Sequence, residues 1–275
     1  MESEHLKIDN ICCGYPGGFQ LRDIAFSLQK GTFAGIIGPN GSGKTTIFRG
    51  ISGGLTLSGG AVWLQSTDIG SLKSSVKARQ LAVVTQFPEV ADMTVEDYVL
   101  MGRMPYRDTF QFFESRHDHD VAQKYMQLTG VYAYRSKLMT QLSGGEQQLA
   151  AIAQALSQEP KLLLLDEPTS HLDISHSVQI LNLIQKLNYE TGLTVLMIIH
   201  DLNLAAEYCD YLVMMDQGKI YTKGTPEEVL NYKNIEEVYK TVVVTQKNPL
   251  SGKPAIFLVS DNIMRQQREK FRGNN

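Results

Sequence analysis

The sequence predicts an α/β fold whose main sheet is largely parallel and covered by helices on both faces. Short continuous apolar runs, such as LLLL (162–165), are typical of strands buried on both faces. Longer segments with apolar residues at three-to-four spacing lie between these runs and predict connecting helices. A glycine-rich loop after one apolar run leads without a gap into a helical pattern.

The elements can be justified in chain order. Residues 5–37 contain short alternating strands with turns at YPGG (15–18) and QKG (29–31), ending in the buried-type run FAGII. AVWLQ and LAVVT, within residues 60–85, predict two more strands. From about residue 88 to 158 the apolar spacing turns helical, which predicts a helical subdomain.

The second half repeats the alternation of strand and helix. KLLLLDEP (161–168) and TVLMIIH (194–200) predict buried strands, each followed by a helical pattern. Residues 226–240 predict one helical segment, and a strand pair is expected around NPLSGKP (248–254). The polar, basic end from residue 264 is expected to be mobile.

Composition limits the function. The chain has 275 residues, is 43% apolar and carries a net charge of −3, so it lacks the basic surface typical of duplex nucleic-acid binding. No apolar run approaches the ~20 residues of a membrane span, and the polar N-terminus does not resemble a signal peptide. We therefore expect a cytosolic protein without direct nucleic-acid contact. Its three cysteines are expected to be free thiols.

The glycine-rich loop matches G-x-x-x-x-G-K-[ST] between a predicted strand and helix. Inward-pointing N–H groups and the helix N-terminus would hold a polyphosphate. Lys44 would reach the β- and γ-phosphates, and the Thr45 hydroxyl would bind Mg²⁺. The expected phosphate-binding residues are Gly38, Pro39, Asn40, Gly41, Ser42, Gly43, Lys44, Thr45 and Thr46.

Two acidic residues end the buried run KLLLLDEP. Asp166 is expected to bind Mg²⁺, directly or through water. Glu167, expected to point the other way along the strand, could polarise a water molecule for in-line attack on the γ-phosphate. A helix-capping or surface acid is the alternative for Glu167. A phosphate loop and two acidic residues alone would be compatible with many ATPases and kinases.

LSGGEQQ (142–148) precedes KLLLLDEP by the length of one helix, and Gln86, Asp173 and His200 fall at matching intervals. With these motifs, the sequence resembles the nucleotide-binding subunit of an ATP-binding cassette (ABC) transporter over nearly its whole length. The resemblance implies an ATPase with ATP and Mg²⁺. Tyr15 would stack on adenine, Gln86 would contact Mg²⁺ and the attacking water, and His200 would contact the γ-phosphate.

On the same resemblance, LSGGEQQ is the signature loop, which closes over the ATP of a second copy arranged head to tail. Ser143, Gly144, Gly145 and Glu146 would lie at this trans interface, together with Asp173 of the D-loop. Ser143 is expected to be the N-cap and Glu146 the third-residue partner of a capping box. Glu146 replaces the family's usual Gln, so we expect its carboxylate to face along the helix, away from nucleotide.

The resemblance also implies how the chain is divided into subdomains. It predicts a P-loop NTPase (RecA-like) core with a mixed, mainly parallel sheet, an antiparallel β subdomain and an inserted helical subdomain. We expect residues 1–87 to hold the β subdomain and the first part of the core, and 88–158 the helical subdomain with the signature loop. Residues 159–225 would complete the core, and 226–275 would be a C-terminal extension.

MTVEDYVLMGRMPY (93–106) and LLLLDEPTSHLDISH (162–176) resemble the importer subfamily for ferric siderophores, haem and cobalamin. This resemblance implies transmembrane permease subunits, and indirectly a substrate-binding protein, as partners at the cytoplasmic face of the membrane. Residues 86–106 would receive a permease helix. For Val95, Val99 and Met101 we expect packing in the helical core instead.

Two further features bear on alternative functions. HDHD (117–120) could suggest a metal site, but residues two apart on a helix face different ways, so a solvated polar face is expected. A soluble, non-transport ABC ATPase is the main alternative function, although such proteins usually carry two cassettes or a coiled-coil insertion. A P-loop GTPase or kinase would need motifs such as N-K-x-D, which are not found.

Overall fold

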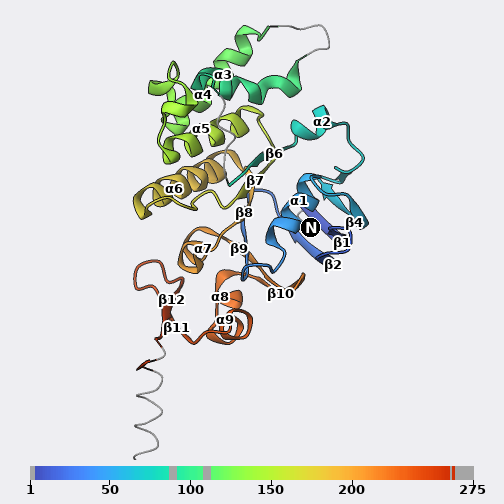
Figure 1. Ribbon diagram of the computed structural model, residues 1–275, viewed down its shortest axis with the longest axis vertical. Helices are drawn as coiled ribbons and strands as arrows, with labels where there is room; N and C mark the ends of the chain where they lie inside the picture. Colours follow the sequence, from blue (N-terminus) through green and yellow to red (C-terminus); the bar gives the residue numbers. More distant parts are fainter. Residues whose placement is uncertain (1–3, 87–91, 108–112, 261, 264–275) are drawn as a thin grey trace, which may run out of the picture.

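The central sheet of the molecule is mainly parallel, as predicted. In the computed structural model, residues 4–86, 92–107, 113–260 and 262–263 are described. The strand order is β10-β9-β3-β8-β7-β6, and every neighbouring pair is parallel except β10 with β9 (Figure 1). These strands are β3 (Phe33–Ile37), β6 (Leu81–Val84), β7 (Leu162–Asp166), β8 (Thr194–Ile198), β9 (Tyr211–Asp216) and β10 (Lys219–Gly224).

Side chains of the central strands are buried on both faces of this sheet. In β7, Leu163 and Leu165 join one core cluster, whereas Leu162 and Leu164 join the other. The first cluster includes residues of α5 (Gly144–Ser157) and α6 (Ile174–Thr191), and the second includes residues of α1 (Lys44–Ser52). Alternating strand side chains therefore bind helices on both faces, which explains the continuous apolar runs.

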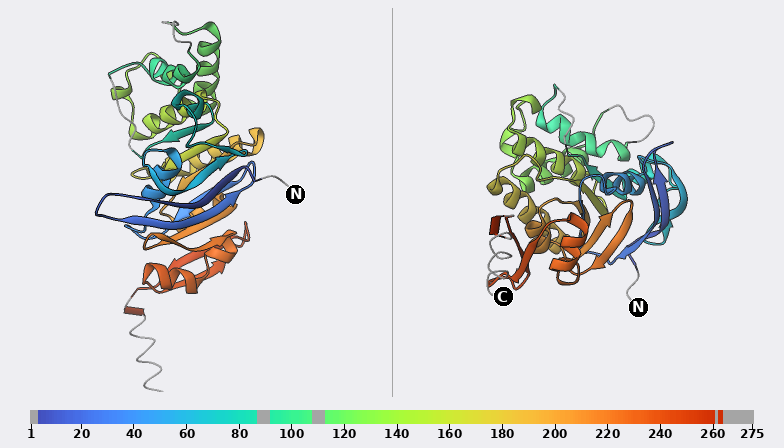
Figure 2. Two further views of the ribbon diagram at one scale, coloured as in Figure 1. Left: turned by 90° about the vertical axis from the view of Figure 1, so that its right-hand side faces the viewer. Right: turned by 60° about the horizontal axis from the view of Figure 1, so that its bottom comes forward.

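An antiparallel sheet packs with α1, in the second cluster. Its order is β2-β1-β4-β5, formed by β1 (Leu6–Gly14), β2 (Gln20–Leu28), β4 (Leu57–Leu64) and β5 (Thr67–Asp68). The right-hand view of Figure 2 shows this blue sheet on one side of the molecule and the green helices on the other. The short helix α2 (Ser74–Ala78) leads into β6.

The helical pattern predicted for this stretch is confirmed in its described residues, 92–107 and 113–157. It comprises α3 (Val95–Leu100), η1 (Met101–Tyr106), α4 (Arg116–Thr129), η2 (Tyr132–Tyr134), η3 (Met139–Gln141) and α5. Val95 and Val99 are fully buried, which confirms the core prediction for both. The same prediction is wrong for Met101, which is 40% exposed because the chain tightens into the 3₁₀ turn η1 there.

The HDHD segment is only partly a solvated face. His117, His119 and Asp120 are exposed, but Asp118 is 5% exposed and accepts a hydrogen bond from Arg103 Nε at 3.0 Å. Arg103 is itself buried and also donates to Ser157 O. The prediction fails for Asp118 because a buried guanidinium from another element, invisible in the local pattern, pairs with its charge.

The C-terminal part contains two helices where the sequence pattern predicted one. Helix α8 (Pro226–Val229) ends before Asn231, whose side chain accepts from Asn234 N and caps α9 (Tyr232–Tyr239). An Asn at this point favours a new helix start over continuation, so the prediction of a single segment is wrong.

The predicted strand pair is confirmed as β11 (Val243–Lys247) and β12 (Pro254–Leu258). Asn203 of α7 (Leu202–Tyr208) holds β12 through two hydrogen bonds with the backbone of Ile256, at 2.8 and 3.3 Å. The expected mobile end, residues 264–275, lies outside the described residues. Cys12, Cys13 and Cys209 are free thiols, as predicted.

None of the helices in the described ranges is both long and apolar enough to span a membrane.

Candidate functional site

The phosphate loop lies between β3 and α1, as the motif predicted. Gly38 has φ 148°, and a Cβ there would approach Met215 O to 2.3 Å, so only glycine allows the loop to pass β9. The Lys44 ammonium donates to Gly38 O at 2.9 Å and to Pro39 O at 3.0 Å. The Lys44 side chain therefore lies against the backbone of the loop and is hydrogen-bonded to it.

A cavity of about 290 Å³ opens over this loop. It brings together Thr45, Glu167 and His200, which come from three separate segments. Its lining residues are Phe19, Asn40, Gly41, Gly43, Lys44, Thr45, Thr46, Glu167 and His200. Most of the predicted phosphate-binding residues therefore surround one space. The helix N-terminus and the Lys44 ammonium make that space suitable for a polyphosphate.

Phe19 belongs to this cavity but was not among the predicted site residues. It follows the YPGG turn, and its ring lies within 2.9 Å of the position that a Cβ of Gly43 would occupy. A single aromatic residue after a turn carries no specific pattern. Its position just after the Tyr15 turn was the only available signal.

Asp166 is the last residue of β7, but Glu167 lies beyond the strand. Glu167 adopts φ 51°, a left-handed conformation that is rare for residues other than glycine. The expectation that Glu167 follows the strand alternation is therefore wrong, because the backbone turns at this residue. Such backbone strain costs roughly 1–3 kcal/mol and is typical of functional sites.

The Glu167 carboxylate connects two predicted catalytic residues. Gln86 Nε2 donates to Glu167 Oε2 at 3.0 Å, and His200 Nε2 hydrogen-bonds to Glu167 Oε1. Gln86 follows β6 and His200 follows β8, which flank β7 on either side. The carboxyl ends of three parallel strands thus bring these side chains to one point, where ligands of open α/β sheets commonly bind.

Charges are concentrated around this point. Burial lowers the pKa of Lys44, against the opposing effects of Glu167 and Asp166. Burial also raises the pKa of Asp166, as does the Glu167 charge, while Arg49, His200 and Lys44 act in the opposite direction. Two acids and one buried ammonium therefore influence one another's charge at this point. A divalent cation beside Asp166 would favour its charged form.

Tyr15 lies in the turn between β1 and β2, and its backbone N–H donates to the backbone oxygen of Phe19, which lines the phosphate cavity, at 3.1 Å. Its hydroxyl accepts a hydrogen bond from Arg49 Nη1 at 3.0 Å, and its side chain is exposed. An exposed ring next to the phosphate loop is available for stacking. The adenine role of Tyr15 stays a prediction.

The signature loop has the capping geometry that the sequence predicted. Ser143 is the N-cap of α5 and accepts from Glu146 N. In return, Glu146 Oε2 accepts from Ser143 N at 2.7 Å and from Ser143 Oγ at 2.8 Å. The Glu146 carboxylate therefore folds back onto its own helix start, as expected.

The D-loop lies beside the signature loop. Asp173 is the N-cap of α6 and accepts from His176 N at 2.8 Å. A Cβ on Gly145 would meet the His176 ring at 3.0 Å, so the starts of α5 and α6 are in close contact. Gly144 is exposed at the same helix start.

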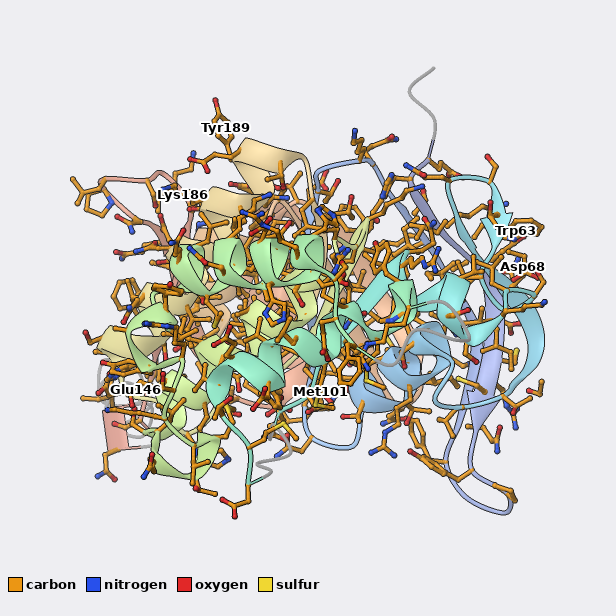
Figure 3. All side chains as sticks on the ribbon, turned by 90° about the horizontal axis from the view of Figure 1, so that it is seen from above. Trp63, Asp68, Met101, Glu146, Lys186 and Tyr189 are labelled. Carbon is orange, nitrogen blue, oxygen red and sulfur yellow. The ribbon has the colours of Figure 1, made fainter. Side chains whose placement is uncertain are left out.

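Signature loop and phosphate loop belong to helices on opposite faces of the central sheet. Helix α5 contributes to one core cluster and α1 to the other. Figure 3 shows Glu146 and Trp63, which belongs to the antiparallel sheet, at opposite sides of the molecule. This separation explains why the motif LSGGEQQ lines no part of the phosphate cavity described above.

Comparison with known proteins agrees with this geometry. The ABC transporter family is matched over residues 21–170. The chain is 35% identical over 252 residues to the ferric enterobactin transport ATP-binding protein FepC of Escherichia coli, covering 91% of this chain and 93% of FepC. It is 34% identical over 250 residues to the iron(3+)-hydroxamate import ATP-binding protein FhuC of Bacillus subtilis, covering 90% of this chain and 93% of FhuC.

A longer relative also matches. The uncharacterized ABC transporter ATP-binding protein YvrA of Bacillus subtilis is 36% identical over 264 residues, and the match spans 95% of this chain but 60% of YvrA.

Solved structures share the fold. An inward-facing ABC transporter described as metal-chelate type gives a TM-score of 0.83 at 24% identity, over 95% of this chain and 100% of that chain. The dimeric structure of MJ0796, a bacterial ABC transporter cassette, gives a TM-score of 0.71 at 26% identity, over 80% of this chain and 98% of that chain. The matches to the ABC transporter family and to FepC and FhuC favour a transporter subunit over a soluble, non-transport ATPase. The chain therefore belongs to the ABC transporter family, as an ATP-binding subunit that hydrolyses ATP.

Proposed function

We propose that this ATPase subunit works as a head-to-tail homodimer around two Mg-ATP and drives a separate permease that imports an iron-siderophore, haem or cobalamin-type substrate. The observation that carries this proposal is the hydrogen bonding of Gln86 and His200 to the two oxygens of Glu167, beside the phosphate cavity. FepC and FhuC, named for ferric enterobactin and iron-hydroxamate, support the substrate class.

For hydrolysis, the phosphate loop would hold the β- and γ-phosphates, with Lys44 neutralising part of their charge. Glu167 would accept the proton of the attacking water, and His200 would contact the γ-phosphate. The hydroxyl of Thr45, the amide oxygen of Gln86 and the carboxylate of Asp166 are hard oxygen donors of the kind that suits Mg²⁺. When bound, that ion would stabilise negative charge on the phosphate oxygens.

The second copy would complete the site. Ser143 and Gly145 are expected to contact the γ-phosphate held by the other subunit, with Asp173 alongside. Two observations support this: α5 and α1 lie on opposite faces of the sheet, and the similar MJ0796 cassette is dimeric. A two-fold axis would then place each signature loop over the partner's ATP.

The permease would bind at the helical region. Met101 and Met104 of η1 are 40% and 53% exposed, and flexible apolar side chains of this kind suit a helix-binding surface. Residues 87–91, part of the predicted groove, lie outside the described residues. The subunit would thus be peripheral, held at the cytoplasmic face of the membrane by the permease.

Light scattering of the Glu167→Gln variant, with and without Mg-ATP, tests the dimer. A monomer that becomes a dimer only with Mg-ATP would support the proposal. A monomer under both conditions, even with the permease present, would contradict it.

A further inference from the structure

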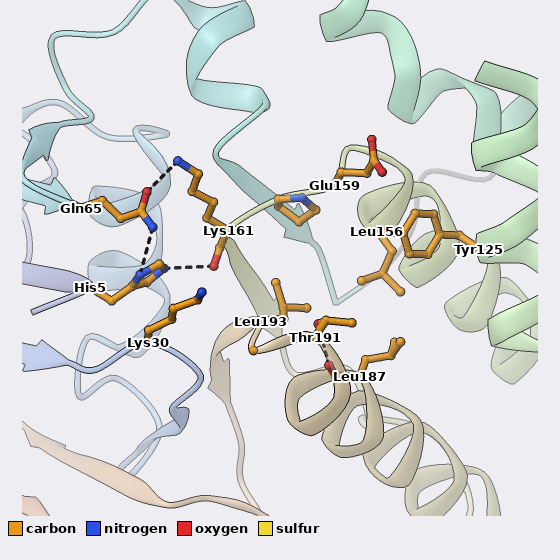
Figure 4. A pocket seen from close by; sticks show the side chains of 12 residues that line it. His5, Lys30, Gln65, Tyr125, Leu156, Glu159, Lys161, Leu187, Thr191 and Leu193 are labelled. Atoms are coloured by element: carbon orange, nitrogen blue, oxygen red, sulfur yellow. Dashed lines mark hydrogen bonds between the residues drawn. The ribbon is translucent and has the colours of Figure 1, made fainter. Parts of the chain in front are cut away.

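A second cavity lies at the end of the sheet opposite to the phosphate loop (Figure 4). Its volume is about 290 Å³. Lys161 and Leu193, which line it, immediately precede β7 and β8, whereas Asp166 and His200 lie at the other ends of these strands. The cavity is therefore distinct from the ATP site, and its walls come from the antiparallel sheet, α4, α5 and α6.

One wall is polar and ordered by hydrogen bonds. His5, only 5% exposed, donates from Nε2 to Lys161 O at 3.3 Å, which leaves its Nδ1 to accept from Gln65 Nε2 at 3.5 Å. Lys161 Nζ in turn donates to Gln65 Oε1 at 2.6 Å. Burial lowers the pKa of His5, the hydrogen bond to Lys161 O opposes this shift, and the nearby charges of Lys30 and Lys161 add to it.

The facing wall is apolar. Leu156, Leu187 and Leu193 are all buried, and the half-buried ring of Tyr125 lies beside them. Figure 4 shows these side chains across the cavity from His5 and Lys161. A ligand with a hydrocarbon or aromatic body would remove this surface from water.

Three acceptors around the cavity already have a donor. Leu187 O accepts from Thr191 Oγ at 2.7 Å, and Leu193 O accepts from Asn188 Nδ2 at 2.7 Å. The lining carboxylate Glu159 accepts through Oε2 from the buried Arg103 at 3.0 Å, and that guanidinium also pairs with Asp118. The charge of Glu159 is therefore partly neutralised.

The lysine ammonium groups at the cavity still have protons available for further hydrogen bonds. An ammonium group has three protons, and Lys161 Nζ makes one hydrogen bond. Within the described ranges, Lys30 has neither a hydrogen-bond nor an ion-pair partner, and its stem packs over Gly192, with Cε 3.6 Å from the position of a Cβ there. The positive charges of Lys30 and Lys161 thus outnumber the single carboxylate, Glu159, among the described residues that line the cavity.

We propose that this cavity binds a small amphipathic monocarboxylate, with its carboxylate between Lys30 and Lys161 and its apolar body against Leu156 and Leu187. The volume is at the lower end of the roughly 300–1,000 Å³ of small-molecule sites, which fits a ligand much smaller than a nucleotide. Paired donors on one side and a hydrocarbon surface on the other match such an acid in both charge and shape.

Isothermal titration of the full chain with octanoate tests this site. Octanoate should bind, octanol should bind at least tenfold more weakly, and octylammonium should not bind. Lys30→Gln should weaken octanoate binding about tenfold, whereas Lys233→Gln, which removes an exposed lysine outside the cavity, should leave it unchanged. Equal binding of octanol, or no effect of Lys30→Gln, would overturn the proposal.

A second variant separates binding from folding. Thr191 is exposed at the rim of the cavity, so Thr191→Trp should obstruct it and abolish octanoate binding while ATP binding stays intact. Full octanoate affinity in this variant would place the ligand elsewhere and would also refute the site.

Discussion

His200 Nε2 and Glu167 Oε1 are hydrogen-bonded although 33 residues separate them in the chain. Gln86 Nε2 holds the other oxygen of the same carboxylate at 3.0 Å. The candidate base, just after β7, is thus held by residues that follow the two neighbouring strands, β6 and β8. The first prediction concerns this carboxylate.

Glu167→Gln should lower ATP turnover by at least about 100-fold, because the amide cannot accept the proton of the attacking water. ATP affinity should stay within about threefold, since the phosphate loop is untouched. A steady-state phosphate-release assay with parallel nucleotide titration measures both. Glu190→Gln, an exposed change on α6, serves as the control, and substantial residual turnover in Glu167→Gln would refute the base role.

Ser143→Arg should block ATP-dependent dimerisation while the isolated subunit still binds ATP. Ser143 is exposed at the start of α5, so the added bulk and charge would fall in the proposed trans contact. Size-exclusion chromatography with Mg-ATP, in the Glu167→Gln background, measures the dimer. A loss of ATP binding by the monomer would instead mean that the loop acts within one chain.

Glu146→Ala should lower the free energy of unfolding by roughly 0.3–1.5 kcal/mol, because it removes one half of the capping box. Hydrogen bonds from the backbone and side chain of Ser143 lower the pKa of Glu146. The carboxylate's contribution should therefore be present above its ordinary, unfolded pKa and be lost as pH falls through the lowered, folded one. Urea unfolding at neutral and acidic pH measures this difference, and a pH-independent cost would exclude the charged cap.

Asp118→Asn should destabilise the fold by about 3 kcal/mol, because it removes the buried one of the two carboxylates that pair with the buried Arg103 guanidinium. Asp120→Asn, two residues along α4 and exposed, should change stability by less than about 0.5 kcal/mol. Urea unfolding of both variants checks the difference. Equal stabilities would mean that Glu159 alone balances Arg103.

Met104→Glu should leave the ATPase activity of the isolated subunit unchanged but reduce co-purification with the permease. The side chain is exposed on η1, so folding should tolerate the change, while a charge would weaken an apolar contact. Tyr189→Glu, at an exposed position on α6, is the matched control. Undiminished co-purification of Met104→Glu would place the permease contact elsewhere.

The sequence by itself determined the parts that depend on neighbouring residues. The phosphate loop, the buried strands around it and the Ser143–Glu146 cap were predicted correctly, because glycine spacing, apolar periodicity and capping act over a few residues. The order of the main elements followed from the same local patterns. The one local error, the unbroken helix over 226–240, came from overlooking Asn231 as a helix start.

The tertiary structure decided what depends on contacts between distant segments. The burial of Asp118 against Arg103 and the hydrogen bonds that join Glu167 to Gln86 and His200 depend on residues from other segments of the chain. Phe19 beside the phosphate loop and the cavity between Lys30 and Leu187 arise in the same way. The burial and the electrostatic environment of a side chain depend on the folded chain as a whole, because its surroundings are supplied mostly by residues that are not its sequence neighbours.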